Sequence, residues 1–259
     1  MQRRTSHPET RHPKRCLDRA YAFLARADMA GERQESSSVG TAVYEDAVPK
    51  RLDSNFLHVE READGETVRA EAERLGRRMV HVPDPELGER LVPYFRNLHW
   101  RVNRVVVMAQ RREPEREADL SLVSEVEEPA LRAARHQVVT GQPWARPEVM
   151  AQLFSGKQLI GRRVNARFFA VVLDGEVVSY TDLYQDGADA QVEDVGTLHE
   201  HRGRGYASAV VLAAIAEARK AGAEFVFLVA DYEDWPKELY RRLGFDELGY
   251  YVKFIAPHT

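Results

Sequence analysis

The chain has 259 residues, a formal net charge of −4 and 44% hydrophobic residues. That length fits one large globular domain or two modest ones, and the acidic balance offers no general basic field for nucleic acid. No apolar run approaches the ~18–20 residues of a membrane span, and no signal-peptide core follows the N-terminus. The single cysteine, Cys16, excludes an intramolecular disulfide and a multi-cysteine metal site. We therefore expect a cytoplasmic globular protein with no metal and no membrane partner.

Residues 1–38 are predicted to form a basic, partly disordered arm. Seven Lys and Arg residues stand against two acids in residues 1–27. Such a segment is compatible with nucleic-acid contact, but a solvated arm is the simpler interpretation, and nucleic acid is not the expected partner. Leu17, Tyr21 and Leu24 have helical spacing, which indicates a short docking helix. Residues 35–38 resemble a linker.

Residues 39–113 are predicted to form a small α/β domain. Strands are expected at 55–59, 79–82 and 103–109, and helices at 67–77 and 85–98. Thr67 is the expected N-cap of the first helix. The charged, proline-containing stretch 113–119 has no apolar periodicity, so we expect the domain boundary there.

Residues 120–259 have the clearest alternation of strands and helices. Helices are expected at 129–140, 147–154, 206–221 and 234–243, and strands at 168–174, 176–184, 190–198, 225–230 and 249–255. Asp174-Gly175 is typical of a hairpin turn. The order hairpin, strand-helix, strand-helix, strand predicts an α/β (α+β) fold with a mixed sheet.

The loop that enters the helix at 206–221 carries the chemistry. Gly203, Gly205 and Ala207 are small residues at alternate positions, and Arg202 and Arg204 add positive charge. A helix N-terminus has unpaired N–H groups and a partial positive charge, so a glycine-rich entry makes an anion cradle. The glycine spacing matches neither a P-loop nor a dinucleotide-binding motif.

Two motifs together resemble the GNAT acetyltransferase superfamily. The segment Arg202-Gly-Arg-Gly-Tyr-Ala207 is similar to its Arg/Gln-x-x-Gly-x-Gly/Ala signature, and Leu239-Tyr-Arg-Arg-Leu-Gly-Phe245 is similar to its Leu-Tyr-x-x-Leu-Gly-Phe signature. The resemblance covers about the last 140 residues, which makes 120–259 the catalytic domain. It implies a central mixed sheet flanked by helices, acetyl-CoA as cosubstrate, and acetyl transfer to a primary amine by direct attack on the thioester.

The resemblance also implies roles for individual residues. The pantetheine arm would pair with the backbone of Val195, Gly196 and Thr197, and the pyrophosphate would meet the segment Gly203, Arg204, Gly205, Tyr206, Ala207 and Ser208. Tyr240 matches the tyrosine that protonates the departing thiolate. Glu233 stands where many members have an asparagine that contacts the cofactor, which puts that contact in doubt. Asp234 resembles a helix N-cap before Trp235 and Pro236. Two roles are open for Trp235, lining the cofactor or acceptor pocket and packing, and packing is the simpler.

A general base is expected on the strand before the loop, where the family often has a carboxylate. Glu193 and Asp194 lie there and face opposite sides of an ideal strand. Glu193 is the preferred base because it shares its face with Val195 and Thr197 in that alternation. The neighbouring His199 and His201 are expected to face solvent.

A second, fainter copy of the motif lies in the N-terminal half. Phe95-Arg-Asn-Leu-His-Trp100 parallels Tyr240-Arg-Arg-Leu-Gly-Phe245 as aromatic, Arg, x, Leu, x, aromatic. The flanking strands correspond as well. No glycine loop precedes the helix at 67–77, and Phe95 has no proton to give. We therefore expect a tandem protein in which 39–113 is a degenerate, smaller GNAT-like half domain.

The acceptor is left open between a small-molecule amine and a peptide amine. The acidic net charge weakly favours a cationic acceptor. The alternative function is a non-catalytic acyl-CoA-binding regulatory module. A homodimer is a further option, with the last strand pairing across the interface.

Overall fold

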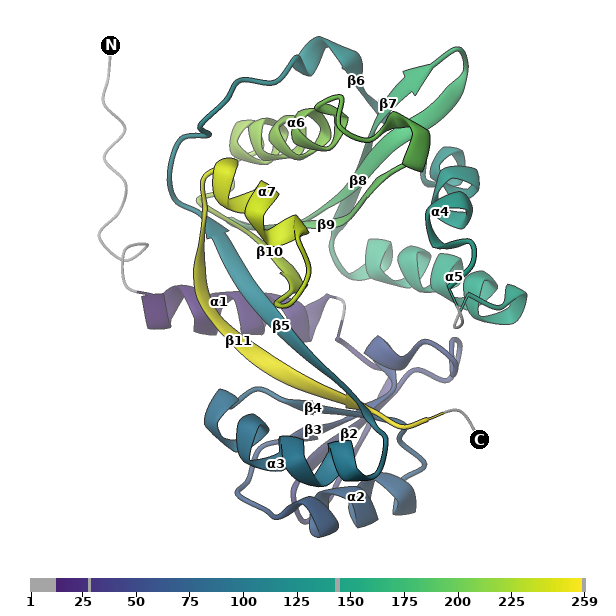
Figure 1. Ribbon diagram of the computed structural model, residues 1–259, viewed down its shortest axis with the longest axis vertical. Helices are drawn as coiled ribbons and strands as arrows, with labels where there is room; N and C mark the ends of the chain where they lie inside the picture. The colour runs from purple at the N-terminus through teal and green to yellow at the C-terminus, as the bar shows by residue number, and fades with distance from the viewer. Residues whose placement is uncertain (1–12, 28, 143–144, 258–259) are drawn as a thin grey trace.

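The computed structural model describes residues 13–27, 29–142 and 145–257. A mixed sheet of eleven strands runs through both halves of the chain, with helices on both faces (Figure 1). The strand order is β1-β2-β3-β4-β11-β5-β10-β9-β8-β7-β6. The predicted α/β class with a central mixed sheet is confirmed. Among the described residues, no helix has the length and apolar character needed to cross a membrane.

The elements follow the predicted order with shifted ends. The strands are β1 (Arg33–Ser36), β2 (Gly40–Tyr44), β3 (Phe56–Val59), β4 (Met79–Val82), β5 (Arg101–Gln110), β6 (Val123–Val126), β7 (Asn165–Leu173), β8 (Glu176–Asp186), β9 (Asp189–Thr197), β10 (Phe225–Asp231) and β11 (Phe245–Ile255). The helices are α1 (Pro13–Arg26), α2 (Gly65–Arg74), α3 (Pro85–Asn97), α4 (Arg132–Val139), α5 (Pro147–Arg163), α6 (Tyr206–Lys220) and α7 (Pro236–Arg242).

The N-terminal segment is more ordered than its composition predicts. Helix α1 buries Cys16, Ala20, Phe23 and Leu24 against the sheet, and β1 pairs with β2. Residues 13–27 and 29–36 therefore belong to the folded body rather than to a solvated arm with a linker, because the apolar stripe of α1 covers a sheet face. Residues 1–12 of the predicted arm lie outside the described residues.

The predicted strand-helix-strand copy is confirmed in the N-terminal half. β4-α3-β5 has the same order as β10-α7-β11, and β3 runs parallel to β4 as β9 does to β10. The last strand of each unit pairs with the opposite unit: β5 pairs with β10, and β11 pairs with β4. The two exchanged strands also pair with each other, from Phe245↔Gln110 to Ile255↔Arg101. This exchange joins the halves into one sheet.

The exchange of β5 and β11 between the halves bears on two expectations, the homodimer strand and the domain boundary. β11 is an interior strand between β4 and β5, whereas the sheet edges are β1 and β6. Val252 to Ile255 pair with both neighbours, whereas Phe245 to Tyr251 pair with β5 alone. Pairing of the last strand across a homodimer therefore stays a prediction for its N-terminal part only. The stretch 113–119 does connect the halves without helix or strand, but the strands on either side of it lie interleaved.

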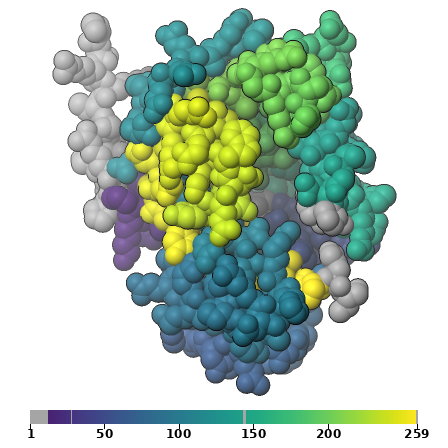
Figure 2. Space-filling view, viewed as in Figure 1, coloured from purple at the N-terminus to yellow at the C-terminus, as the bar shows by residue number. Residues whose placement is uncertain are grey.

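Alternation along the central strands divides the helices between two faces. Val106 and Met108 of β5 pack with α6 and α7, whereas Val107 packs with α1 and α5. Helices α2 and α3 cover the same face as α6 and α7, over β4 and β11. Figure 2 shows this face, with α6 and α7 together above α3. Helices α1, α4 and α5 cover the other face.

Candidate active site

The sheet opens where β9 and β10 separate. In the described sheet, β10 pairs with β9 only from Phe225↔Asp189 to Phe227↔Gln191. β9 continues to Thr197 with β8 on its other side, and β10 continues to Asp231 with β5 on its other side. The facing edges beyond Gln191 and Phe227 therefore present backbone groups to a gap, and unpaired strand edges readily accept a further strand.

A β-bulge shapes the β9 side of this gap. The register with β8 jumps from Tyr180↔Gly196 to Asp182↔Glu193, and Asp194 has a φ of 53°. An extra residue breaks the alternation of a strand. Consequently Val195 packs on the α6 face, while Glu193 lies beside Asp182 on the α5 face. The expectation that Glu193 and Val195 share a face is wrong because the bulge lies between them.

The glycine loop leaves the N-terminus of α6 open. Gly203 and Gly205 have φ values of 75° and 84°, a left-handed conformation that favours glycine. A Cβ built on either meets no atom within 4 Å. Gly205 is the N-cap, and no side chain caps the first turn of α6. The first N–H groups of a 15-residue helix thus face open space, the arrangement that binds anions.

A cleft of about 740 Å³ lies over this loop on the α6 and α7 face. Its wall contains every residue predicted to hold the cofactor: Val195, Gly196, Thr197, Gly203, Arg204, Gly205, Tyr206, Ala207 and Ser208. His201, expected to face solvent, also lines the cleft, whereas His199 is exposed. Trp235 lines the cleft and is 61% exposed, so the expectation that it packs is wrong. It is itself the N-cap of α7, ahead of Pro236.

Tyr240 lines the same cleft from α7 and is 8% exposed. Burial raises the pKa of its hydroxyl well above the ordinary value, and the nearby carboxylates of Glu193 and Asp194 raise it further. A phenol with a raised pKa stays protonated and is available as a proton donor. Glu233, at the doubtful asparagine position, instead forms an ion pair with Arg104 at 3.0 Å.

Glu193 lies on the opposite side of the sheet from Tyr240. Its side chain accepts a hydrogen bond from Gln191 Nε2 at 3.0 Å, and Thr181 Oγ1 donates to its carbonyl oxygen at 3.0 Å. Glu193 does not line the α6-side cleft described above. The acid and base candidates therefore border the gap from its two faces.

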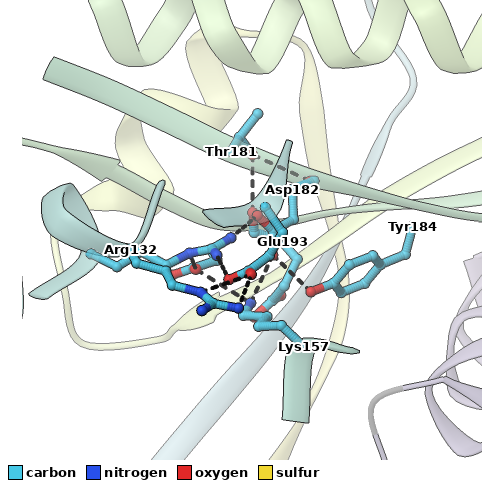
Figure 3. A network of polar contacts seen from close by, with 9 residues as sticks. Arg132, Lys157, Thr181, Asp182, Tyr184 and Glu193 are labelled. Carbon is cyan, nitrogen blue, oxygen red and sulfur yellow. Dashed lines mark hydrogen bonds and ion pairs between the residues drawn. The ribbon is translucent and has the colours of Figure 1, made fainter. Parts of the chain in front are cut away.

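A network of buried charges that local sequence patterns do not predict surrounds Glu193 (Figure 3). Arg135 of α4 is ion-paired with Asp182 and, at 2.8 Å, with Asp194. Lys157 of α5 lies 2.9 Å from Asp182 and 3.3 Å from Asp194. Tyr184 donates a hydrogen bond to Asp182 at 2.7 Å. Asp182, a carboxylate inside the apolar strand predicted at 176–184, was a local signal of a buried charge. Its partners could not be predicted, because they come from two separate helices.

The network distinguishes the two candidate bases. Burial alone would raise the pKa of Asp194, but Lys157 and Arg135 outweigh it and hold that pKa below the ordinary value. Burial likewise opposes the charge of Lys157, yet Asp182 and Asp194 keep its pKa well above the usual range. Asp194 is therefore a weak proton acceptor, because its charge is already compensated.

The corresponding place in the N-terminal half is closed. Helix α2 begins after Asp64, whose carboxylate accepts a hydrogen bond from Thr67 N at 2.8 Å. The predicted N-cap at Thr67 is thus wrong, because the carboxylate three residues earlier satisfies that N–H. Phe95, the counterpart of Tyr240, is fully buried, with its ring stacked 4.4 Å from that of Phe254.

Comparisons with known proteins agree with this geometry. Residues 131–245 match the family model described as acetyltransferase (GNAT) family. No curated protein matches the chain.

Several solved structures share the fold. A conserved protein of unknown function from Staphylococcus epidermidis has a TM-score of 0.65 at 14% identity, over 89% of this chain and 96% of that one. A GCN5-related N-acetyltransferase from Kribbella flavida has a TM-score of 0.59 at 18% identity, over 95% of each chain. A tandem GNAT protein from the clavulanic acid biosynthesis pathway has a TM-score of 0.50 at 14% identity, over 89% and 86%. At these identities the likeness establishes a shared fold.

Proposed function

We propose that the protein transfers an acetyl group from acetyl-CoA to a primary amine, and the premise is the match of residues 131–245 to the acetyltransferase (GNAT) family model. The observation that carries the proposal is the gap between β9 and β10, which lies between the uncapped N-terminus of α6 and the buried hydroxyl of Tyr240.

The residues around the gap fit acetyl-CoA. The open first turn of α6 suits the pyrophosphate, since helix N-terminal N–H groups bind anions, and Arg204 adds a positive charge at the cleft wall. The free edge of β9 at Val195, Gly196 and Thr197 suits the amide groups of pantetheine, because an unpaired edge accepts an added strand. Arg202 Nε donates to Thr197 O at 3.3 Å, which ties the loop to this edge.

The bound thioester supplies an activated acyl carbon. During transfer, the bond between the amine nitrogen and that carbon forms, and the carbon–sulfur bond breaks. Tyr240 gives its proton to the departing sulfur, a role that suits a hydroxyl kept protonated by burial. Glu193 takes the proton from the amine on the other face of the sheet. Asp194 is the poorer acceptor because Arg135 and Lys157 compensate its charge.

The test is a thiol-release assay with acetyl-CoA and a panel of primary amines. We expect CoA release that depends on both acetyl-CoA and an amine. Glu193→Gln should lower kcat and change the pH dependence of the rate, because the variant cannot accept the proton. An unchanged pH profile would remove Glu193 from the role. Tight acetyl-CoA binding with no turnover across the panel would instead favour the regulatory-module alternative.

A further inference from the structure

A second cavity, of about 630 Å³, lies on the opposite face of the sheet from the cofactor cleft. Its wall combines β5, β11, the start of α5 and the loop at 49–55. Val105 and Ile255 line it from the face that packs with α1 and α5. The size falls within the range of small-molecule sites. The cavity is separate from the cleft beside α6.

The wall of this cavity, here called the basic pocket, is strongly positive. It contains seven Lys and Arg side chains against two acids, Asp53 and Glu148. That is a formal excess of five positive charges inside a chain whose net charge is −4. A concave site lined by one sign of charge concentrates ligands of the opposite sign. The negative net charge of the whole chain favoured a cationic acceptor, but the charge of this pocket favours an anionic group instead.

The charges in the wall are only partly compensated. The two acids are matched to two lysines: Lys253 pairs with Asp53, and Lys50 lies 3.7 Å from Glu148. Lys253 holds the pKa of Asp53 at about 2. Arg78 donates to the neutral carbonyl of Ala256 at 3.1 Å.

Four further arginines line the pocket. Arg51 donates a hydrogen bond to the hydroxyl of Ser54. Arg77 donates to the carbonyl of Leu75 and to the side-chain oxygen of Asn55, at 3.1 and 3.2 Å. Within the described residues, Arg101 and Arg146 make no ion pair and are exposed at the pocket wall. Arginine is the side chain best suited to carboxylates and phosphates, because its planar fork can donate two parallel hydrogen bonds.

The basic pocket lies one strand away from the gap between β9 and β10. Val105 of its wall pairs directly with Asp231 of β10, the strand that borders the gap. Along α5, Val149 and Leu153 line the pocket, and Lys157 follows one turn later beside Asp194. Helical rise puts Lys157 about 6 Å beyond Leu153 and about 16 Å beyond Arg146.

We propose that the basic pocket binds the acceptor, and that the acceptor is a small amine with a carboxylate or phosphate group held by Arg101 and Arg146. This inference rests on the proposed acyl transfer. The amine end would lie at the gap, among the carboxylates of Glu193 and Asp194, while the anionic end lies among the arginines. Such a ligand carries both signs of charge, separated by about 6–16 Å along α5.

The first experiment measures anion binding without acyl transfer. Inorganic pyrophosphate is titrated by calorimetry into wild-type protein, R101Q/R146Q, Gly205→Val and Arg162→Gln. Arg162 is exposed on α5 outside the pocket wall, so it is the matched control. The loop before α6 is also proposed to hold a pyrophosphate, so wild type should show two sites. The site that Gly205→Val leaves intact should be at least about tenfold weaker in R101Q/R146Q and unchanged in Arg162→Gln. A site in the basic pocket also persists in Gly205→Val. Binding lost only in Gly205→Val, or equal in all four proteins, would overturn the proposal.

The second experiment compares three acceptors of one length: 6-aminohexanoate, 6-aminohexyl phosphate and 6-amino-1-hexanol. We expect kcat/KM for one of the anionic amines to exceed that for the alcohol by at least about tenfold. The preference should disappear in R101Q/R146Q while turnover of the alcohol stays the same. Turnover of the alcohol with no anionic preference would reject the pocket and leave acyl transfer standing. Pyrophosphate binding with no turnover of any amine would reject acyl transfer and leave the pocket standing.

Discussion

The two halves of the molecule have the same order of strands and helices, but they differ at the helix N-terminus and at the aromatic residue of the second helix. Each contains a parallel strand pair, a helix between those strands, and a strand-helix-strand unit whose last strand crosses to the other half. In the C-terminal half, α6 begins at Gly205 with no side-chain cap. In the N-terminal half, α2 begins at Asp64, which caps it. Tyr240 faces a cleft, whereas Phe95 is sealed against Phe254.

The difference shows that this order of strands and helices can be kept without an open cleft for a ligand. β9 extends past its pairing with β10 and so leaves a gap, whereas β3 and β4 have four residues each, paired over three positions. The N-terminal half contributes instead β5, an interior strand that pairs with β10, and part of the basic pocket. The N-terminal half has a capped helix and a phenylalanine in place of the open helix end and the tyrosine, while its scaffold still completes the sheet.

The largest expected effect comes from replacing Tyr240 with phenylalanine, the residue that the N-terminal half has at the corresponding position, Phe95. Tyr240→Phe should lower kcat about 10²–10⁴-fold, because general-acid catalysis typically contributes that much. Acetyl-CoA affinity should change little, since the ring remains. Steady-state kinetics under chemistry-limited conditions measure this. Full kcat in the variant would exclude Tyr240 as the acid.

The next largest effect concerns the glycine loop. Gly205→Val should weaken acetyl-CoA binding at least about tenfold, because a β-branched residue avoids positive φ and its side chain enters the open turn. The matched control is Gly222→Val, at the other end of α6, where φ is 95° and the space is also open. Calorimetry should show normal binding in the control. Equal weakening in both variants would mean that backbone strain, not the cradle, causes the loss.

The reverse exchange, Phe95→Tyr, should cost stability without adding activity. The new hydroxyl would enter a fully buried aromatic cluster with Trp100 and Phe254. Burying an unpaired polar group costs about 1–3 kcal/mol. Denaturant unfolding measures the loss. Unchanged stability together with a second acetyl-CoA site would contradict a closed N-terminal half.

The smallest effect concerns the cap of α2. Hydrogen bonds from the backbone and side chain of Thr67 lower the pKa of Asp64, so its stabilising contribution is present above the ordinary carboxyl pKa and is lost as pH falls below it. Asp64→Ala should lower Tm at pH 7, and the difference from wild type should shrink towards pH 3. Acetyl-CoA affinity should stay unchanged. A difference in Tm that does not vary with pH would show that the ionised carboxylate of Asp64 does not stabilise α2.

Local patterns predicted most of the framework. The Asp174-Gly175 turn lies between β7 and β8 as expected, because a hairpin turn depends on two adjacent residues. The glycine loop, Tyr240 and the tandem copy could be predicted as well, because each depends on a short continuous motif. The helix expected at 147–154 continues to Arg163, since its packing on the sheet outweighs weak local signals.

The features that escaped prediction depend on residues far apart in the chain. The ion pairs of Asp182 join β8 to α4 and α5, and the seven cations of the basic pocket come from both halves. The bulge puts its positive φ at Asp194, which is not a glycine, so the residue type there does not reveal it. Strand exchange between β5 and β11 is likewise invisible locally, because each strand has the same apolar pattern whichever neighbour it pairs with.

The central claim, one open half and one closed half, is tested most directly by the stoichiometry of acetyl-CoA binding. Calorimetric titration of the full chain should give one saturable site per chain, weakened by Gly205→Val and unaffected by Asp64→Ala. Two sites per chain would show that the N-terminal half also binds the cofactor. No binding at high micromolar acetyl-CoA would contradict the assignment of the open half.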